Sequence, residues 1–147
     1  MNFQISLYNR NEAFLRIINN LPKKRKEVYL TIQQHKNCTL EKIARILKCR
    51  PSDISGRVTE LKKCFLIKEN KILDSQRTGN SITSYIILNE DERIDLVNKH
   101  YILLRDEKDK IINDINKYDN LSKESKKILL LRVDKINKEI KALKKVI

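Results

Sequence analysis

Residues 39–70 read TLEKIARILKCRPSDISGRVTELKKCFLIKEN, and this stretch decides the predicted fold. Apolar side chains recur in it at three- and four-residue spacing, which is typical of amphipathic helices. One helix is expected from Thr39 to about Lys48 and a second over residues 52–63, with the short turn CRP between them. The apolar positions are Leu40, Ile43, Ala44 and Leu47 in the first helix and Ile54, Val58 and Leu61 in the second.

The first residue of each of these helices suits a helix start. Thr39 and Ser52 are both residue types that accept hydrogen bonds from the free N–H groups of a first turn, so we expect each to cap its helix. Two further helices are predicted upstream, over residues 11–21 and from Lys23 to His35, separated by Pro22. Proline is well placed where a new helix begins.

A β-hairpin is predicted after the second helix. The segments FLIKENKILD (residues 65–74) and SITSYIIL (residues 81–88) are rich in strand-forming residues. The turn cluster SQRTGNS joins them, and its glycine favours a tight reversal with a polar tip.

The order helix, helix, helix, hairpin over residues 22–89 resembles a winged helix-turn-helix domain of the kind found in MarR-like regulators. The pattern T-x-x-x-I-A-x-x-L resembles the first helix of that motif, S-x-x-S-x-x-V-x-x-L the recognition helix, and the Leu-Ile pair the first strand of the wing. The resemblance implies a mainly α fold that binds double-stranded DNA, with the recognition helix in the major groove and the wing at the minor groove or the backbone.

The C-terminal residues 90–147 carry a heptad-like apolar stripe on two arms, which predicts an antiparallel, coiled-coil-like helical hairpin. The stripe positions are Ile94, Val97, Tyr101, Leu104, Ile111, Ile115 and Tyr118 on the first arm and Leu129, Val133, Ile136, Ile140, Leu143 and Ile147 on the second. The turn is expected at residues 118–122, with Ser122 as the cap of the second arm. We expect this region to form a homodimer; the alternative is a hairpin packed on the N-terminal helix. The predicted organisation is therefore an N-terminal helix (1–21), the winged helix (22–89) and the hairpin (90–147).

The charge is concentrated in the predicted winged helix. The chain has a formal net charge of +13. Residues 22–89 contain 15 Lys and Arg against six Asp and Glu, whereas residues 90–147 contain 15 against 12. A locally basic domain favours a polyanionic partner, and nucleic acid is the first candidate.

Three groups of side chains are the expected DNA contacts. Arg57 is expected to reach a guanine, because arginine to guanine is the commonest base contact. Glu60 is awkward beside phosphates: it could accept a hydrogen bond from a cytosine amine or simply be solvated. Gly56 could permit close approach of the DNA backbone or merely be tolerated. The full predicted set is Ser52, Ser55, Gly56, Arg57, Thr59, Glu60 and Lys63 on the helix, Arg77, Thr78 and Asn80 on the wing tip, and Lys23, Lys24, Arg25, Lys48 and Arg50 as phosphate contacts.

No enzyme, cofactor, metal site or small-molecule ligand is predicted. His35, Cys38, Cys49 and Cys64 lack the paired spacing of zinc modules, and no phosphate-binding loop or carboxylate pair is present. Three cysteines are too few for a disulfide framework, no apolar run is long enough to span a membrane, and no secretory signal is evident. A cytoplasmic, nucleoid-associated location in a bacterial, phage or archaeal host cell is expected.

The most concrete expectation is a transcriptional regulator. The Lys-, Asn- and Ile-rich composition favours an AT-rich genome, with a phage or mobile element as one possible source. The alternative function is a protein-docking winged helix in a replication, partition or structural assembly.

Overall fold

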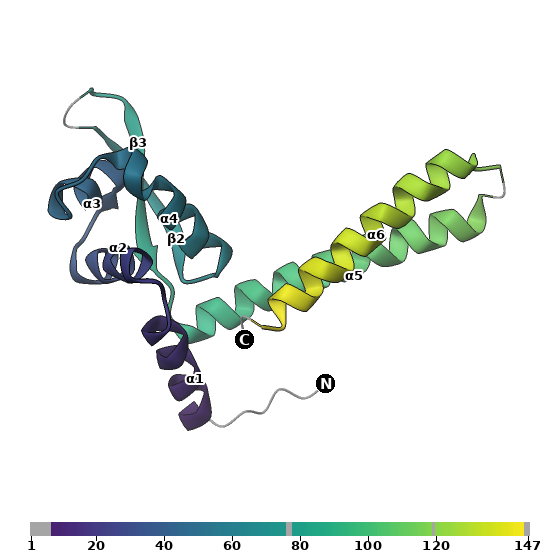
Figure 1. Ribbon diagram of the computed structural model, residues 1–147, viewed down its shortest axis with the longest axis horizontal. Coiled ribbons are helices and arrows are strands. Elements are labelled where there is room, and N and C mark those ends of the chain that lie inside the picture. Colours follow the sequence, from purple (N-terminus) through teal and green to yellow (C-terminus); the bar gives the residue numbers. More distant parts are fainter. Residues whose placement is uncertain (1–6, 76–77, 119, 146–147) are drawn as a thin grey trace. The chain divides into compact units, whose positions relative to one another are not determined.

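The computed structural model describes residues 7–75, 78–118 and 120–145. Over these residues the chain forms six helices and three strands (Figure 1). Their bounds are α1 Leu7–Asn19, α2 Lys23–Gln34, β1 Cys38–Thr39, α3 Leu40–Ile46, α4 Pro51–Lys63, β2 Ile67–Asp74, β3 Ser81–Ile87, α5 Glu90–Lys117 and α6 Lys123–Leu143. The chain divides into two compact units, Met1–Arg93 and Ile94–Ile147, so the boundary falls inside α5.

The first unit has a winged helix-turn-helix fold. Its three strands form an antiparallel sheet in the order β1-β3-β2. The wing strands β2 and β3 pair from Ile67 opposite Ile87 to Asp74 opposite Ser81, with an irregularity between Glu69 and Ile72. The two-residue β1, which the sequence did not predict, pairs Cys38 with Tyr85 and so joins the start of α3 to the wing. The predicted mainly α class with a small hairpin is confirmed.

The core of this unit lies among α2, α3, α4 and the base of the sheet. It includes Val28, Tyr29 and Ile32 of α2, Ile43 and Ala44 of α3, Ile54, Val58 and Leu61 of α4, and Leu66 and Ile67 before and in β2. The α4 side chains are almost fully enclosed, with exposed fractions of 3% for Ile54, 3% for Val58 and 0% for Leu61. The predicted apolar face of α4 therefore holds this helix on the domain.

The helix starts agree with the sequence at two of three predicted caps. The Thr39 side chain accepts a hydrogen bond from the backbone N–H of Lys42, and the Ser122 side chain accepts one from the N–H of Ser125. The prediction that Ser52 caps α4 is wrong. That helix begins one residue earlier at Pro51, and the Asp53 carboxylate accepts from the backbone N–H of Arg50 at 3.1 Å. The first helix also starts earlier than predicted, at Leu7, and ends at Asn19.

The second unit is an antiparallel helical pair, in which α6 runs back alongside the later part of α5 (Figure 1). The Arg132 guanidinium of α6 donates to both carboxylate oxygens of Glu107 on α5, at 2.8 and 2.9 Å. Apolar positions of the predicted stripe are buried, including Leu104, Val133, Ile136 and Leu143, but Tyr118 is 50% exposed. The stripe position Ile147 lies outside the described residues.

Several large aliphatic side chains outside that stripe are exposed. They are Ile102 and Leu103 on α5 and Ile128, Leu130 and Leu131 on α6, and we call these five residues the exposed aliphatic set. None of the helices in the described parts of the chain has the length and apolarity that a bilayer crossing requires.

Candidate nucleic-acid interface

The outer face of α4 is open, as the sequence predicted for a recognition helix. Ser52, Ser55, Gly56, Thr59 and Lys63 are exposed, while the opposite face packs into the core. A helix held from behind by aliphatic side chains, with polar groups outward, has the geometry required to enter a major groove.

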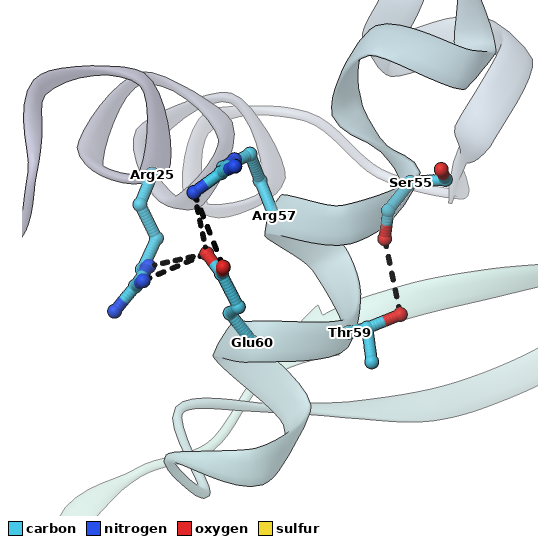
Figure 2. A network of polar contacts seen from close by, with 5 residues as sticks. All are labelled: Arg25, Ser55, Arg57, Thr59 and Glu60. Atoms are coloured by element: carbon cyan, nitrogen blue, oxygen red, sulfur yellow. Dashed lines mark hydrogen bonds and ion pairs between the residues drawn. The ribbon is translucent and has the colours of Figure 1, made fainter.

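Arg57 and Glu60 do not extend freely from this face, which differs from the expectation. Figure 2 shows Arg25 of α2 and Arg57 of α4 converging on the Glu60 carboxylate. Arg25 donates from Nε at 3.0 Å and from Nη2 at 2.7 Å, both to Oε2 of Glu60. Arg57 donates from Nη1 to Oε2 at 2.8 Å and to Oε1 at 3.2 Å. Glu60 is therefore neither simply solvated nor an unpaired acceptor, and we call these three residues the arginine–glutamate triad.

The small polar residues on the outer face are tied to their own helix. The Ser55 hydroxyl donates to the Ser52 carbonyl at 3.2 Å. The Thr59 hydroxyl donates to the Ser55 carbonyl at 3.1 Å, the bond drawn in Figure 2. A methyl group added at Gly56 would meet nothing within 4 Å. Packing within the chain therefore does not require glycine there, and an approaching DNA backbone remains a prediction.

The predicted phosphate contacts lie in two places. Lys23 and Lys24 are exposed in the first turn of α2, whereas Arg25, in the same run, is committed to Glu60. Lys48 is exposed in the turn between α3 and α4, with φ of 53°. That left-handed conformation is one that glycine adopts more readily. Arg50 follows, with its side chain 84% exposed and its Nε 3.7 Å from Asp53.

The wing tip is organised around Ser75. Its backbone N–H donates to the Asn80 carbonyl and its carbonyl accepts from Gly79, both at 2.8 Å. Gly79 has φ of 69°, a left-handed conformation that favours glycine. The predicted contacts Thr78 and Asn80 are exposed at this tip. Arg77, the predicted minor-groove contact, lies outside the described residues.

A contact that the sequence did not predict joins the wing tip to α3. The Ser75 hydroxyl donates to the Glu41 carboxylate, 3.0 and 2.9 Å from its two oxygens, and accepts from the N–H of Thr78 at 3.2 Å. Ser75 is only 3% exposed. The Glu41–Ser75 contact therefore fixes the base of the wing tip against the helix-turn-helix.

The cysteines have the environments of packing residues. Cys38 is fully enclosed, and its thiol donates to the His35 carbonyl at 3.2 Å. Burial raises the pKa of the Cys38 thiol, while the positive charge of Lys42 acts in the opposite direction. Since a neutral thiol is a poor nucleophile and metal ligand, Cys38 is not prepared for either role. Over the described ranges, no three His, Cys, Asp or Glu side chains gather as a metal site would require.

Comparisons with known proteins give distant structural likenesses only. No protein-family profile matches the sequence, and no curated protein matches it either. Among solved structures, this chain is similar to ZitR of Lactococcus lactis, a zinc-responsive MarR family member, with 16% identity, coverage of 91% of this chain and 99% of that one, and a TM-score of 0.39.

Two other solved structures have the same degree of likeness. Streptococcus pneumoniae FabT in complex with DNA is 12% identical, covers 94% of this chain and 99% of its own, and has a TM-score of 0.39. A MarR/EmrR family transcriptional regulator from Acinetobacter sp. ADP1 has the same four values. At such TM-scores the likeness assigns no role to any residue here, and the winged-helix assignment rests on the element order and sheet register.

Proposed function

We propose that this protein binds double-stranded DNA as a transcriptional regulator, with α4 in the major groove and the wing tip at the minor groove or the backbone. The observation that carries the proposal is the open polar face of α4, which is held from behind by Ile54, Val58 and Leu61. The basic excess of residues 22–89 supports it, because phosphate neutralisation supplies much of the affinity for DNA.

Phosphate contacts and base contacts have different roles in this proposal. Lys23, Lys24, Lys48 and Arg50 contact phosphates and position the domain, since such contacts carry no sequence information. Arg57 reads a base edge. At the wing tip, Thr78, Asn80 and Arg77 are the proposed contacts to the minor groove or the backbone.

The helical pair joins two copies of the chain. Charge complementarity favours a second copy as the occupant of its exposed surface: α5 has six basic and eight acidic residues, whereas α6 has seven basic and three acidic. The exposed aliphatic set would then be covered by the partner. A two-fold dimer presents two recognition helices to half-sites about 34 Å apart, one turn of DNA.

Binding to duplexes across a salt series tests the proposal. A duplex selected from a random pool should bind the wild-type protein, and the logarithm of the affinity should fall by about 0.9 per log unit of salt for each phosphate neutralised. Lys24→Ala should weaken all duplexes alike, and Arg57→Ala should cost about 1–3 kcal/mol at one base pair. Lys110→Ala, an exposed lysine of α5, is the matched control and should leave affinity unchanged.

The competing function gives a different result in the same experiment. A protein-docking winged helix would bind every duplex weakly, without preference for length or sequence, and Lys24→Ala and Arg57→Ala would not differ from Lys110→Ala. That result would reject the DNA-binding proposal.

A further inference from the structure

We infer that Glu60 and Arg25 act through Arg57, holding its guanidinium so that one edge is presented to a guanine. This inference rests on the proposed DNA-binding function and adds a specificity-determining relay to it. The relay consists of the arginine–glutamate triad: Arg25 on α2 anchors Glu60, and Glu60 positions Arg57 on α4 (Figure 2).

The two arginines bind the Glu60 carboxylate through different nitrogen atoms of their guanidinium groups. Arg25 gives Glu60 its Nε and Nη2 groups, which together form the side edge of the guanidinium. Arg57 gives only Nη1. Among the described residues, nothing accepts a hydrogen bond from Nε or Nη2 of Arg57, so its side edge remains available. Two parallel N–H donors are what a guanine requires for a bidentate contact to O6 and N7.

Burial and position support an anchoring role for Arg25. Its side chain is 21% exposed, compared with 40% for Arg57, so Arg25 is the more enclosed of the two cations. It also comes from a different helix, so its contact fixes the carboxylate of Glu60 relative to α2 as well as to α4. An arginine held in one geometry before binding loses less conformational freedom when it meets the base.

If Glu60 positions Arg57, removing its charge should change sequence preference rather than affinity for all duplexes. A solvated acidic residue only repels phosphates, so removing it would raise affinity for every duplex equally. A positioning residue acts on preference: its removal frees Arg57 to bind phosphates anywhere, and discrimination at one base pair falls. The same reasoning separates the two roles of Arg25, because a phosphate contact affects all sequences and an anchor affects one position.

Selection of duplexes from a random pool, followed by affinity measurements on single-base variants, tests the relay. The wild-type protein should prefer a guanine at one position, and Arg57→Ala should lose that preference. Glu60→Gln and Arg25→Lys should lose it at the same position, by about tenfold, although Arg25→Lys keeps the positive charge. Glu27→Gln is the matched control: it removes one exposed acidic charge from α2, and selectivity should be unchanged.

The outcomes separate the relay from the function on which it rests. If the wild-type protein selects no duplex, the proposed function fails and the relay fails with it. If it selects a duplex but Glu60→Gln behaves like Glu27→Gln, or Arg25→Lys weakens all sequences uniformly, only the relay is overturned. Circular dichroism of each variant verifies folding, and Arg25→Lys decides the question if Glu60→Gln unfolds.

Discussion

The winged-helix unit and the helical pair differ in where their exposed aliphatic side chains lie. In the first unit, α2, α3, α4 and the sheet enclose one continuous apolar cluster, and the exposed Leu15, Ile46 and Ile72 belong to three different elements, α1, α3 and β2. In the second, residues such as Ile136 are fully enclosed, yet the exposed aliphatic set remains uncovered, with Leu103 at 67% and Ile128 at 66%.

This difference indicates two kinds of apolar pattern in one chain. The heptad-like stripe of residues 90–147 supplies the interior of the helical pair itself, as Ile136 and Val133 illustrate. Because Ile136 is 0% exposed within a single chain, the proposed second copy would contact the exposed aliphatic set rather than this residue.

The largest expected effect is the loss of stability when a core side chain of the winged-helix unit is truncated. Leu61→Ala removes a fully enclosed side chain from the first unit and should lower the free energy of unfolding by about 2–5 kcal/mol. Leu131→Ala, at a side chain that is 59% exposed, should change it by less than about 0.5 kcal/mol at concentrations where the chain is monomeric. Urea denaturation measures both. Equal losses would show that the two regions do not differ in this way.

A charge placed in the exposed aliphatic set tests whether this surface binds a second copy of the chain. Leu131→Asp places a charge in the exposed aliphatic set and should raise the dimer dissociation constant by about tenfold or more, with helix content retained. Asn137→Asp adds the same charge at an exposed polar position of α6 and serves as the control. Light scattering over a concentration series gives the result. A wild-type chain that is monomeric throughout would remove the dimer from the proposed function.

A loss of stability smaller than that of Leu61→Ala is expected at the Glu41–Ser75 contact. Ser75→Ala removes a buried hydroxyl that donates to a carboxylate, and should cost about 1.5–3 kcal/mol of stability. Because this contact holds the wing tip, amide exchange at residues 78–80 should accelerate and duplex affinity should fall uniformly. Ser81→Ala, an exposed serine of the same hairpin, should alter neither. Unchanged exchange in Ser75→Ala would mean that the contact does not order the tip.

The local patterns of the sequence predicted most of the fold. Helical spacing in residues 39–63 located α3 and α4, and strand-forming residues around SQRTGNS located the wing. These features are set by neighbours within a few residues. The wrong prediction at Ser52 also concerns neighbouring residues. Pro51 suits the first helical position and the Asp53 carboxylate accepts from the backbone N–H of Arg50, so the helix starts one residue sooner.

Two polar contacts in and beside the candidate site could not be predicted in this way. Arg25 and Glu60 are 35 residues apart, and Glu41 and Ser75 are 34 apart. Such pairs leave no periodic pattern, because their meeting depends on how the helices and the sheet pack. The Arg57–Glu60 pair differs from these, because its members are three residues apart on α4 and such a spacing is visible in a sequence. The contact from Arg25 to the same carboxylate depends on how α2 packs against α4.

The smallest expected effect is a loss of stability at acidic pH, which one ion pair in each unit should produce. The hydrogen bond from Lys68 holds the pKa of Glu92 below its usual value, and that from Arg132 does the same for the pKa of Glu107. A carboxylate whose pKa is lowered by folding stabilises the native state above its unfolded-state pKa, and this contribution is lost as the pH falls through the folded value. The Glu92 side chain is 40% exposed and the Glu107 side chain 41%, so solvent screens both pairs and each contribution is small.

Thermal unfolding between about pH 6 and pH 3 measures these contributions, since the ordinary pKa of Glu is about 4.3. The melting temperature of the wild-type chain should fall more steeply over this range than that of Glu107→Gln, which has no charge to lose at that position. Glu92→Gln should flatten the curve in the same direction. If Glu107→Gln alone leaves the slope unchanged, the Arg132–Glu107 pair contributes nothing to the helical pair, and its association rests on the buried aliphatic side chains.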